Sequence, residues 1–536
     1  MKIEVTSQAG TSLLKGGGSS VPVSDLLSVT AESPSPVEIA EDARRKQIET
    51  LNRARRSSLG QFFTPPETAR LMASLSSVSR ERLRILDAGA GAGALTGALV
   101  EAICSRTERP KELFLVAYEL DEIVLPDLRR TLSTCEMLCA TAGIRCTWEI
   151  RTTDFIESAV TTLDAGLFRT APESFDIAIL NPPYKKFRAK SRVRKLLRRL
   201  NIETSNLYAA FLALVVLLLD KGGELVAITP RSFCNGPYFR PFREHLLRNV
   251  NLTRLHVFES RFDAFKEDNV LQENLILHAV KSVPQQASIC VSKSHSPNEP
   301  VVDKRCVPFD SVVRPGDAEV FIHLVPDGDG HVLARRMEML PCTLDALSVD
   351  VSTGRVVDFR AREWLRTDSN SKTVPLIYPA HFDNGLVQWP KPNFKKPNAI
   401  EYNAASASLM VPGGVYVLVR RFSAKEERRR VVAAIFDPET VPCEFIGFEN
   451  HINYFHERGA PLDRNLARGL SVFLNSTPLD SYFRQFNGHT QVNATDLRSL
   501  RYPTRDALIE MGRRVGQILP AQGVIDSIVA EMIGVR

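Results

Sequence analysis

A polar tetrapeptide, Asn181-Pro182-Pro183-Tyr184, follows directly after the apolar run 175–180. The two prolines keep the segment out of helix and sheet, so its side chains are held where a buried strand ends. Open α/β sheets bind their ligands at that edge. The side-chain oxygen of Asn181 and the carbonyl oxygen of Pro182 can each accept a hydrogen of an amine, which supports the positive charge that develops as the amine attacks. The segment therefore predicts methyl transfer to an exocyclic amine, and the alternative is an ordinary proline-rich turn.

The aromatic residue of the tetrapeptide indicates which amine is attacked. The N6 amine of adenine is a poor nucleophile because its lone pair is delocalised into the ring, so it needs such acceptors. A base inside a duplex must be rotated out of the stack to reach a pocket, and stacking on Tyr184 would offset part of that cost. We expect Asn181, Pro182, Pro183 and Tyr184 to form the catalytic site.

A glycine-rich turn lies upstream. The strand-like run 84–86 leads into Asp87-Ala88-Gly89-Ala90-Gly91-Ala92-Gly93, and a helix-like stretch follows from 95 to 103. Glycines let the backbone bend tightly and approach a nucleotide-like ligand closely. Alone, this pattern would also suit the pyrophosphate of a dinucleotide.

Acidic residues follow the next two strand-like runs. Glu119 comes after 113–118, where a carboxylate can accept both hydroxyls of a ribose. Asp154-Phe155 follows 146–151, and an acid beside an aromatic ring suits the amine and the ring face of an adenine. Either acidic residue alone is better explained as a helix cap or a solvated turn. Together with the glycine-rich turn, however, they make three sites at successive strand ends, which favours a single nucleotide-like cofactor.

In chain order, these motifs and Gly60-Gln61-Phe62-Phe63-Thr64-Pro65 resemble the gamma class of amino-methyltransferases that act on adenine N6 in DNA. The resemblance implies S-adenosylmethionine as the cofactor. Segments 222–243, 268–274 and 486–493 look like the PstI and BsuBI group of type II modification methylases, and the resemblance covers about residues 45–505. The cofactor contacts it implies are Phe63, Thr64, Asp87, Gly89, Gly91, Gly93, Glu119, Asp154 and Phe155.

The resemblance implies a site-specific DNA methyltransferase that modifies a flipped-out adenine in a short sequence, as the modification enzyme of a type II restriction-modification system. Its implied partners are double-stranded DNA and a separately encoded restriction endonuclease. The alternatives are methylation of RNA or of protein glutamine, methylation of cytosine N4, where Ser commonly replaces Asn, and a catalytically idle DNA-binding subunit.

A basic run follows the tetrapeptide. Residues 185–199 carry nine Lys and Arg side chains and no acid, which an apolar core would not tolerate. Because the run begins beside the proposed base pocket, we expect it to contact phosphates of the flipped strand, although a solvated loop would have the same composition. The expected contacts are Lys185, Lys186, Arg188, Lys190 and Arg192.

Recognition of one sequence needs side chains that read base edges, and a region beyond the catalytic core offers candidates. Arg420 and Arg421 can contact phosphate or guanine, as can 428–430. Asn and Gln residues within 485–493 suit bidentate base contacts. The alternatives are a solvated helix face for 428–430 and hydrogen bonds to loop backbone for the amides. From the polar cluster we expect DNA contacts by His489, Gln491 and Asn493.

The composition indicates the general class of protein. The 536 residues are 44% hydrophobic with a net charge of +6, as in a globular protein of two or three domains. The longest apolar run, 207–219, is too short to cross a bilayer and predicts a buried helix. Nine scattered cysteines without a close pair suggest reduced thiols in a cytoplasm and no structural metal. The resemblance implies that this cytoplasm is bacterial or archaeal.

We expect an α/β protein with a Rossmann-like methyltransferase domain that depends on S-adenosylmethionine and a second, mixed α/β target-recognition domain. Since about forty residues before the core cannot hold a nuclease, the nuclease should be a separate protein. The expected divisions are a disordered tail (1–44), the catalytic domain (45–285), a linker (286–300), the target-recognition domain (301–505) and a C-terminal helical segment (506–536).

Overall fold

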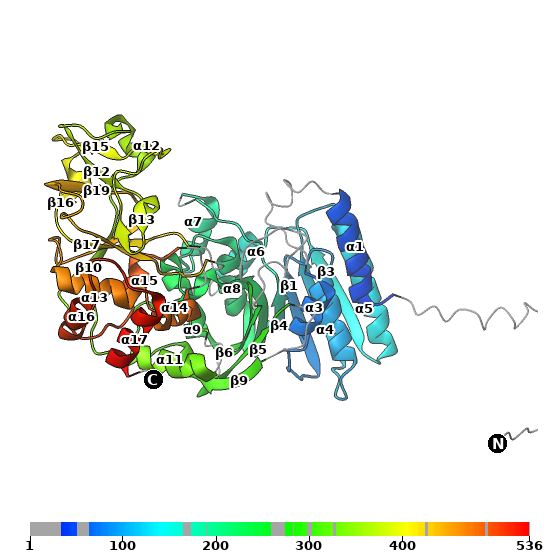
Figure 1. Ribbon diagram of the computed structural model, residues 1–536. Helices are drawn as coiled ribbons and strands as arrows, with labels where there is room; N and C mark the ends of the chain where they lie inside the picture. The colour runs from blue at the N-terminus through cyan, green and yellow to red at the C-terminus, as the bar shows by residue number, and fades with distance from the viewer. Residues whose placement is uncertain are drawn as a thin grey trace, which may run out of the picture. The chain divides into compact units, whose positions relative to one another are not determined.

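The computed structural model describes residues 34–50, 64–164, 173–188, 190–258, 274–281, 284–296, 303–324, 328–423, 427–487 and 491–534. Nine strands form one sheet in the order β3-β2-β1-β4-β5-β7-β6-β8-β9 (Figure 1). The first five of these strands pair in parallel, and β7 lies antiparallel between β5 and β6. The strands are β1 (Arg82–Ala88), β2 (Glu112–Tyr118), β3 (Arg145–Arg151), β4 (Phe175–Leu180), β5 (Leu219–Pro230), β6 (Val250–Phe258), β7 (Asn274–Lys281), β8 (Ser288–Ser294) and β9 (Asp303–Pro308).

Helices cover both faces of this sheet, because alternate strand residues enter two different cores. In β1, Leu86 and Ala88 join the core formed with α6 and α8, whereas Leu83 and Ile85 join the core formed with α3, α4 and α5. All six residues of β4 are buried, as expected for a central parallel strand. The helices of this region are α1 (Pro36–Thr50), α3 (Pro66–Ala73), α4 (Ala94–Cys104), α5 (Leu125–Thr141), α6 (Phe155–Leu163), α7 (Arg192–Arg198), α8 (Leu207–Leu218), α9 (Arg240–Asn249) and α10 (Phe309–Val312).

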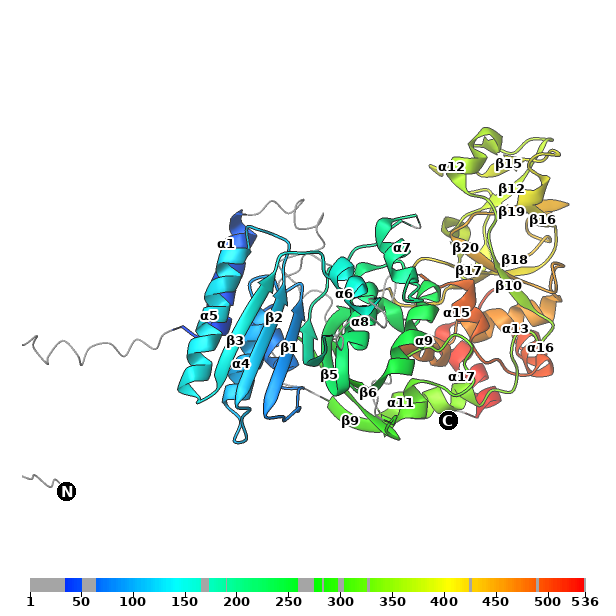
Figure 2. The same cartoon turned by 180° about the vertical axis from the view of Figure 1, so that it is seen from behind.

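The structure differs from two of the expected boundaries. The segment 286–300, expected to be a linker, contains β8, which pairs in parallel with β6 and antiparallel with β9. Its composition is polar because only alternate residues such as Ile289 and Val291 are buried. The expected tail 1–44 contains the start of α1, which begins at Pro36 and lies along α4 and α5 in both views (Figures 1 and 2).

The region beyond the central sheet is mixed α/β, as expected. A six-stranded sheet has the order β10-β20-β17-β18-β14-β13, and a five-stranded sheet has the order β11-β15-β12-β19-β16. The strands are β10 (Asp350–Thr353), β11 (Leu365–Arg366), β12 (Thr373–Ile377), β13 (Phe382–Asp383), β14 (Leu386–Val387), β15 (Ala399–Glu401), β16 (Met410–Pro412), β17 (Tyr416–Arg420), β18 (Ala433–Phe436), β19 (Phe445–Phe448) and β20 (Ile452–His456). The helices are α11 (Gly328–Glu338), α12 (Asp358–Ala361), α13 (Arg464–Leu474), α14 (Thr477–Phe486), α15 (Ala494–Arg498), α16 (Arg505–Arg513) and α17 (Gln522–Ile533).

Two helices of this region cross at very short range. A Cβ atom on Gly469 of α13 would lie 1.7 Å from the carbonyl oxygen of Leu508, and one on Gly512 of α16 would lie 1.9 Å from that of Asn465. Leu508 and Met511, both in α16, are fully buried. Ile518 is 66% exposed, because it lies between α16 and α17 rather than on one continuous helix.

A buried arginine joins the nine-stranded sheet to the second region. Arg231, directly after β5, donates to the carbonyl oxygens of Arg484 (3.2 Å) and Gln485 (2.5 Å) in the last turn of α14. These carbonyls lack helical partners at a helix C-terminus, so a guanidinium can satisfy them. In the described part of the chain, no helix is long and apolar enough to span a membrane.

Candidate functional site

The glycine-rich turn joins β1 to α4. Gly89, Gly91 and Gly93 have φ values of 85°, 55° and 86°, a left-handed conformation that side chains disfavour. A Cβ atom on Gly93 would also lie 3.0 Å from Leu128 and from Thr131 of α5. The sequence therefore uses glycine here for backbone shape and for close helix packing, as expected for a nucleotide-binding turn.

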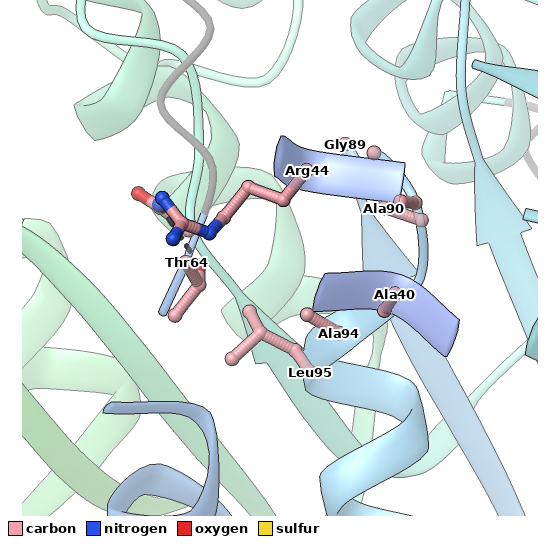
Figure 3. A pocket seen from close by; sticks show the side chains of 10 residues that line it. Ala40, Arg44, Thr64, Gly89, Ala90, Ala94 and Leu95 are labelled. Carbon is pink, nitrogen blue, oxygen red and sulfur yellow. Dashed lines mark hydrogen bonds between the residues drawn. The ribbon is translucent and has the colours of Figure 1, made fainter. Parts of the chain in front are cut away.

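A pocket opens beside this turn (Figure 3). Its lining includes Asn181, which directly follows β4. The cofactor turn and the catalytic tetrapeptide predicted from sequence are thus neighbours. A Cβ atom on Gly89 would lie 4.0 Å from Pro183, so the two segments are in near contact. The lining residues are Ala40, Arg44, Thr64, Gly89, Ala90, Gly91, Ala92, Ala94, Leu95 and Asn181.

Ala40 and Arg44 were not predicted from the sequence. They belong to α1, in the segment expected to be a disordered tail. The signal available in the sequence was an uninterrupted helix-forming stretch from Pro36, with alanines at 40 and 43 on one face.

Two buried carboxylates lie at the turn. Asp87 accepts a hydrogen bond from the Thr96 hydroxyl (2.7 Å); burial together with the nearby charge of Glu119 raises its pKa to about 7. Glu119 accepts from the backbone N–H of Gly91 and of Asp121, each at 2.8 Å, and burial raises its pKa as well. Burial disfavours the ionised form of both carboxylates, so a cationic ligand at this end of the site would stabilise that form.

Asp154 and Phe155 lie where β3 leads into α6. Asp154 is the N-cap of α6 and accepts from the backbone N–H of Glu157 at 2.9 Å, which is the helix-cap alternative left open by the sequence. Phe155 is 3% exposed and packs on Tyr118 and Phe211 with ring centroids 5.1 and 4.9 Å apart. Phe211 in turn approaches Gly89, so these rings form one wall behind the turn.

The amide of Asn181 is oriented by Thr64. Its Nδ2 donates to the Thr64 hydroxyl at 3.1 Å, which makes Oδ1 the atom of the amide that can accept a hydrogen. The Tyr184 ring is not free to stack on a base in this conformation. Its hydroxyl donates to the carbonyl of Ile228 (3.2 Å), and its half-buried ring meets Tyr208 edge-on at 6.1 Å. Phe63, predicted with Thr64, lies outside the described residues.

The basic run divides into two parts. The second half is largely paired with acids: Arg192 with Glu157 (2.9 Å), Arg194 and Arg198 with Glu203, and Arg199 with Asp164. The first half, nearer Tyr184, is exposed at Lys185, Lys186, Arg188 and Lys190. Within the described residues no ion pair joins Lys186, Arg188 or Lys190 to an acid, so these charges are the better candidates for phosphate.

Arg420, Arg421 and Gln491 lie close together in the second region. Phe422 and Gln491 form an antiparallel bridge, and the backbone N–H of Val492 donates to the carbonyl of Arg421 at 2.7 Å. Arg420 forms an ion pair with Glu427 at 3.2 Å. Phe422 is 40% exposed beside the ring of His451, a neighbour that sequence motifs did not indicate.

Other residues of the polar cluster have structural roles, the alternative left open for the amides. Asn493 forms a capping box with Asp496 at the start of α15 and is 9% exposed. Asn487 donates to the carbonyl of Gln491 (3.0 Å) and accepts from Arg430, which is itself buried. Residues 428–430 are not helical, and His489 lies outside the described residues.

The chain is similar to known restriction-modification proteins. A family model described as "Eco57I restriction-modification methylase" matches residues 142–265, which include β4 and the tetrapeptide. The Type IIL restriction-modification enzyme MmeI, solved in complex with DNA, superimposes with a TM-score of 0.51 at 12% identity, covering 93% of this chain and 74% of that one. The fold is that of restriction-modification enzymes, and the family model that matches β4 and the tetrapeptide describes a methylase.

Two curated relatives match nearly the whole chain. The type II methyltransferase M.PstI of Providencia stuartii is 45% identical over 497 residues, which are 92% of this chain and 97% of that protein. M.BsuBI of Bacillus subtilis is 43% identical over 491 residues, 89% and 96% of the two chains. The chain belongs to this family of type II methyltransferases.

Proposed function

We propose that this protein transfers the methyl group of S-adenosylmethionine to N6 of an adenine rotated out of double-stranded DNA, within a short recognition sequence. In this proposal it is the modification enzyme of a type II restriction-modification system, and its partner nuclease is a separate protein. The observation that carries the proposal is the position of Asn181 at the end of β4, on the same pocket as the glycine turn.

The residues of the pocket fit the cofactor. The positive-φ glycines admit a nucleoside close to the backbone, and the Glu119 carboxylate lies at the end of β2, where it can accept ribose hydroxyls. The buried carboxylates of Asp87 and Glu119 favour a ligand that carries a positive sulfonium. Thr64 and the turn 89–93 would hold the methionine end, and Phe155 would lie behind the adenine ring. The bound cofactor supplies an activated methyl group, so the protein does not need to activate a leaving group.

The chain's own residues would act on the amine. Asn181 Oδ1, oriented by the bond from Nδ2 to Thr64, and the carbonyl of Pro182 would each accept a hydrogen bond from N6. After the methyl group is transferred, the amine would release its surplus proton to solvent. These acceptors draw the nitrogen toward a tetrahedral geometry and stabilise its developing charge. Holding N6 in line with the methyl carbon would provide much of the remaining acceleration. Tyr184 would contact the base only if its ring turns away from Tyr208 and Ile228.

DNA would be held by two surfaces. Lys185, Lys186, Arg188 and Lys190 would contact phosphates next to the flipped base, since they follow Tyr184 directly and are exposed. Arg420, Arg421 and Gln491 would contribute to base and phosphate contacts in the second region.

The test is single-molecule sequencing of DNA from a methylation-deficient bacterial host that expresses the full chain. We expect N6-methyladenine at every copy of one short motif, and none in cells that carry the Asn181→Ala variant. Methylation at cytosine N4, or unmodified DNA from soluble protein that binds S-adenosylmethionine, would contradict the proposal.

A further inference from the structure

The helix α1 contributes to the wall of the cofactor pocket. Ala40 and Arg44, one turn apart on α1, line the pocket together with the glycine turn, and Arg44 extends toward Thr64 (Figure 3). No motif of the cofactor site lies in α1.

α1 is anchored to the catalytic domain along its length. At its start, the backbone N–H of Val37 donates to Glu101 of α4 at 3.1 Å. Near its end, Gln47 Nε2 donates to Asp127 of α5 at 3.2 Å. Ala40 and Ala43 are buried in a cluster with Ala92 and Val124. Arg44 is therefore held at the pocket by a docked helix.

A neighbouring carboxylate orients the Arg44 side chain. Nε and Nη2 of Arg44 donate to the two oxygens of Glu41 at 2.6 and 2.9 Å, and both side chains are only 12–13% exposed. Although burial raises the pKa of Glu41, the bonds from Arg44 and Arg45 lower it overall, so the pair is ionic. A guanidinium has five donors in a planar fork and can bind a second carboxylate at another edge.

Among the described residues that line the pocket, Arg44 carries the only positive charge. The other polar groups there are the backbone of the turn, the Thr64 hydroxyl and the Asn181 amide. The nearby carboxylates of Asp87 and Glu119 would repel an anion. A carboxylate that enters the pocket beside Thr64 would therefore meet Arg44 as the positively charged side chain of the described lining, in addition to its pairing with Glu41.

We infer that Arg44 binds the α-carboxylate of S-adenosylmethionine, and that the Glu41–Arg44 pair makes α1 a part of the cofactor site. This inference rests on the proposed function, because it assumes the cofactor. It assigns the methionine carboxylate to a charged partner outside the sequence motifs.

The test is calorimetric titration of the full chain with S-adenosylmethionine and with decarboxylated S-adenosylmethionine. We expect wild type to bind the decarboxylated analogue about tenfold to 100-fold more weakly, the range for a hydrogen bond to a charged group. Arg44→Met should lose a similar factor for S-adenosylmethionine and change little for the analogue. Arg44→Lys should recover part of the loss.

Arg45→Met is the matched control. Arg45 donates to the same Glu41 at 2.7 Å, but its side chain is 70% exposed and does not line the pocket. It should bind both ligands as wild type does. Equal affinity of wild type for the two ligands, or an equal loss for both in Arg44→Met, would overturn the inference while leaving the proposed function intact. Wild type that binds neither ligand would overturn both.

Discussion

At the scale of single residues, Asn181 is the group whose role is most sharply defined. Its amide is oriented by Thr64, so the oxygen is the atom available to accept from an amine. That interaction strengthens as charge develops on the amine and is weak in the ground state. Removing it should therefore affect turnover more than binding.

We expect Asn181→Ala to lower kcat by at least about 100-fold, the scale of losing one preorganised stabilising hydrogen bond. The dissociation constants for S-adenosylmethionine and for DNA should change by less than about threefold. Methyl incorporation into DNA and calorimetric titration of the cofactor measure the two quantities. A variant that keeps wild-type turnover would remove Asn181 from the catalytic site.

Some residues of the site could be predicted from sequence motifs and others could not. Asn181 and the glycine turn were predicted because their residue types are dictated by chemistry and backbone conformation. Arg44 was missed because its role depends on how α1 docks, which is a tertiary property. Asn493 shows the opposite case, since a residue type suited to base contact caps a helix instead.

At the scale of elements, the order of strands, turns and helices around β1 to β5 followed from apolar runs and the polar residues that end them. The strand β8 did not, because a short strand with alternating burial resembles a polar loop in composition. The start of α1 was hidden for a related reason, since its buried face consists of small alanines rather than large apolar side chains. Both errors concern elements whose stability comes from their neighbours.

The crossing of α13 and α16 provides a test of packing at this scale. Gly469→Ala places a methyl group 1.7 Å from the Leu508 carbonyl, so the helices must separate. We expect a loss of at least about 2 kcal/mol in stability, as for an overpacked core. Thermal unfolding of this variant and of wild type measures the loss.

Gly523→Ala is the control. Gly523 is also helical, in α17, but no atom lies within 4 Å of its added Cβ. It should leave stability unchanged or raise it by up to about 1 kcal/mol, because alanine favours the helix. Equal effects of the two substitutions would show that the close crossing does not limit stability.

At the scale of the whole molecule, DNA binding should depend on where positive charge lies rather than on the net charge of +6. Many arginines are paired with acids, including those in the second half of the basic run. The exposed charges just after Tyr184 are therefore expected to dominate the electrostatic attraction of that surface.

We expect the double variant Lys186→Ala, Arg188→Ala to weaken DNA binding and to reduce the slope of log K against log salt by about 1.8, or about 0.9 per lost phosphate contact. Fluorescence anisotropy at several salt concentrations measures this slope. The control, Arg82→Ala with Lys111→Ala, removes the same charge from exposed side chains at the amino-terminal ends of β1 and β2, away from the carboxyl ends where the site lies. If the two double variants have the same slope, the basic run does not contact phosphate.

The strands β8 and β9 have a consequence for hybrids made by joining this chain to a relative. A hybrid joined within 286–300 would draw adjacent strands of one sheet from two parents, because Ser288 pairs with Pro308 across β8 and β9. A junction after Leu324 keeps the sheet whole. Arg231 would then need acceptors from the other parent, but its partners at Arg484 and Gln485 are backbone carbonyls. Any parent whose corresponding helix ends at the same place supplies them, so the second region can be exchanged without matching side chains at this contact.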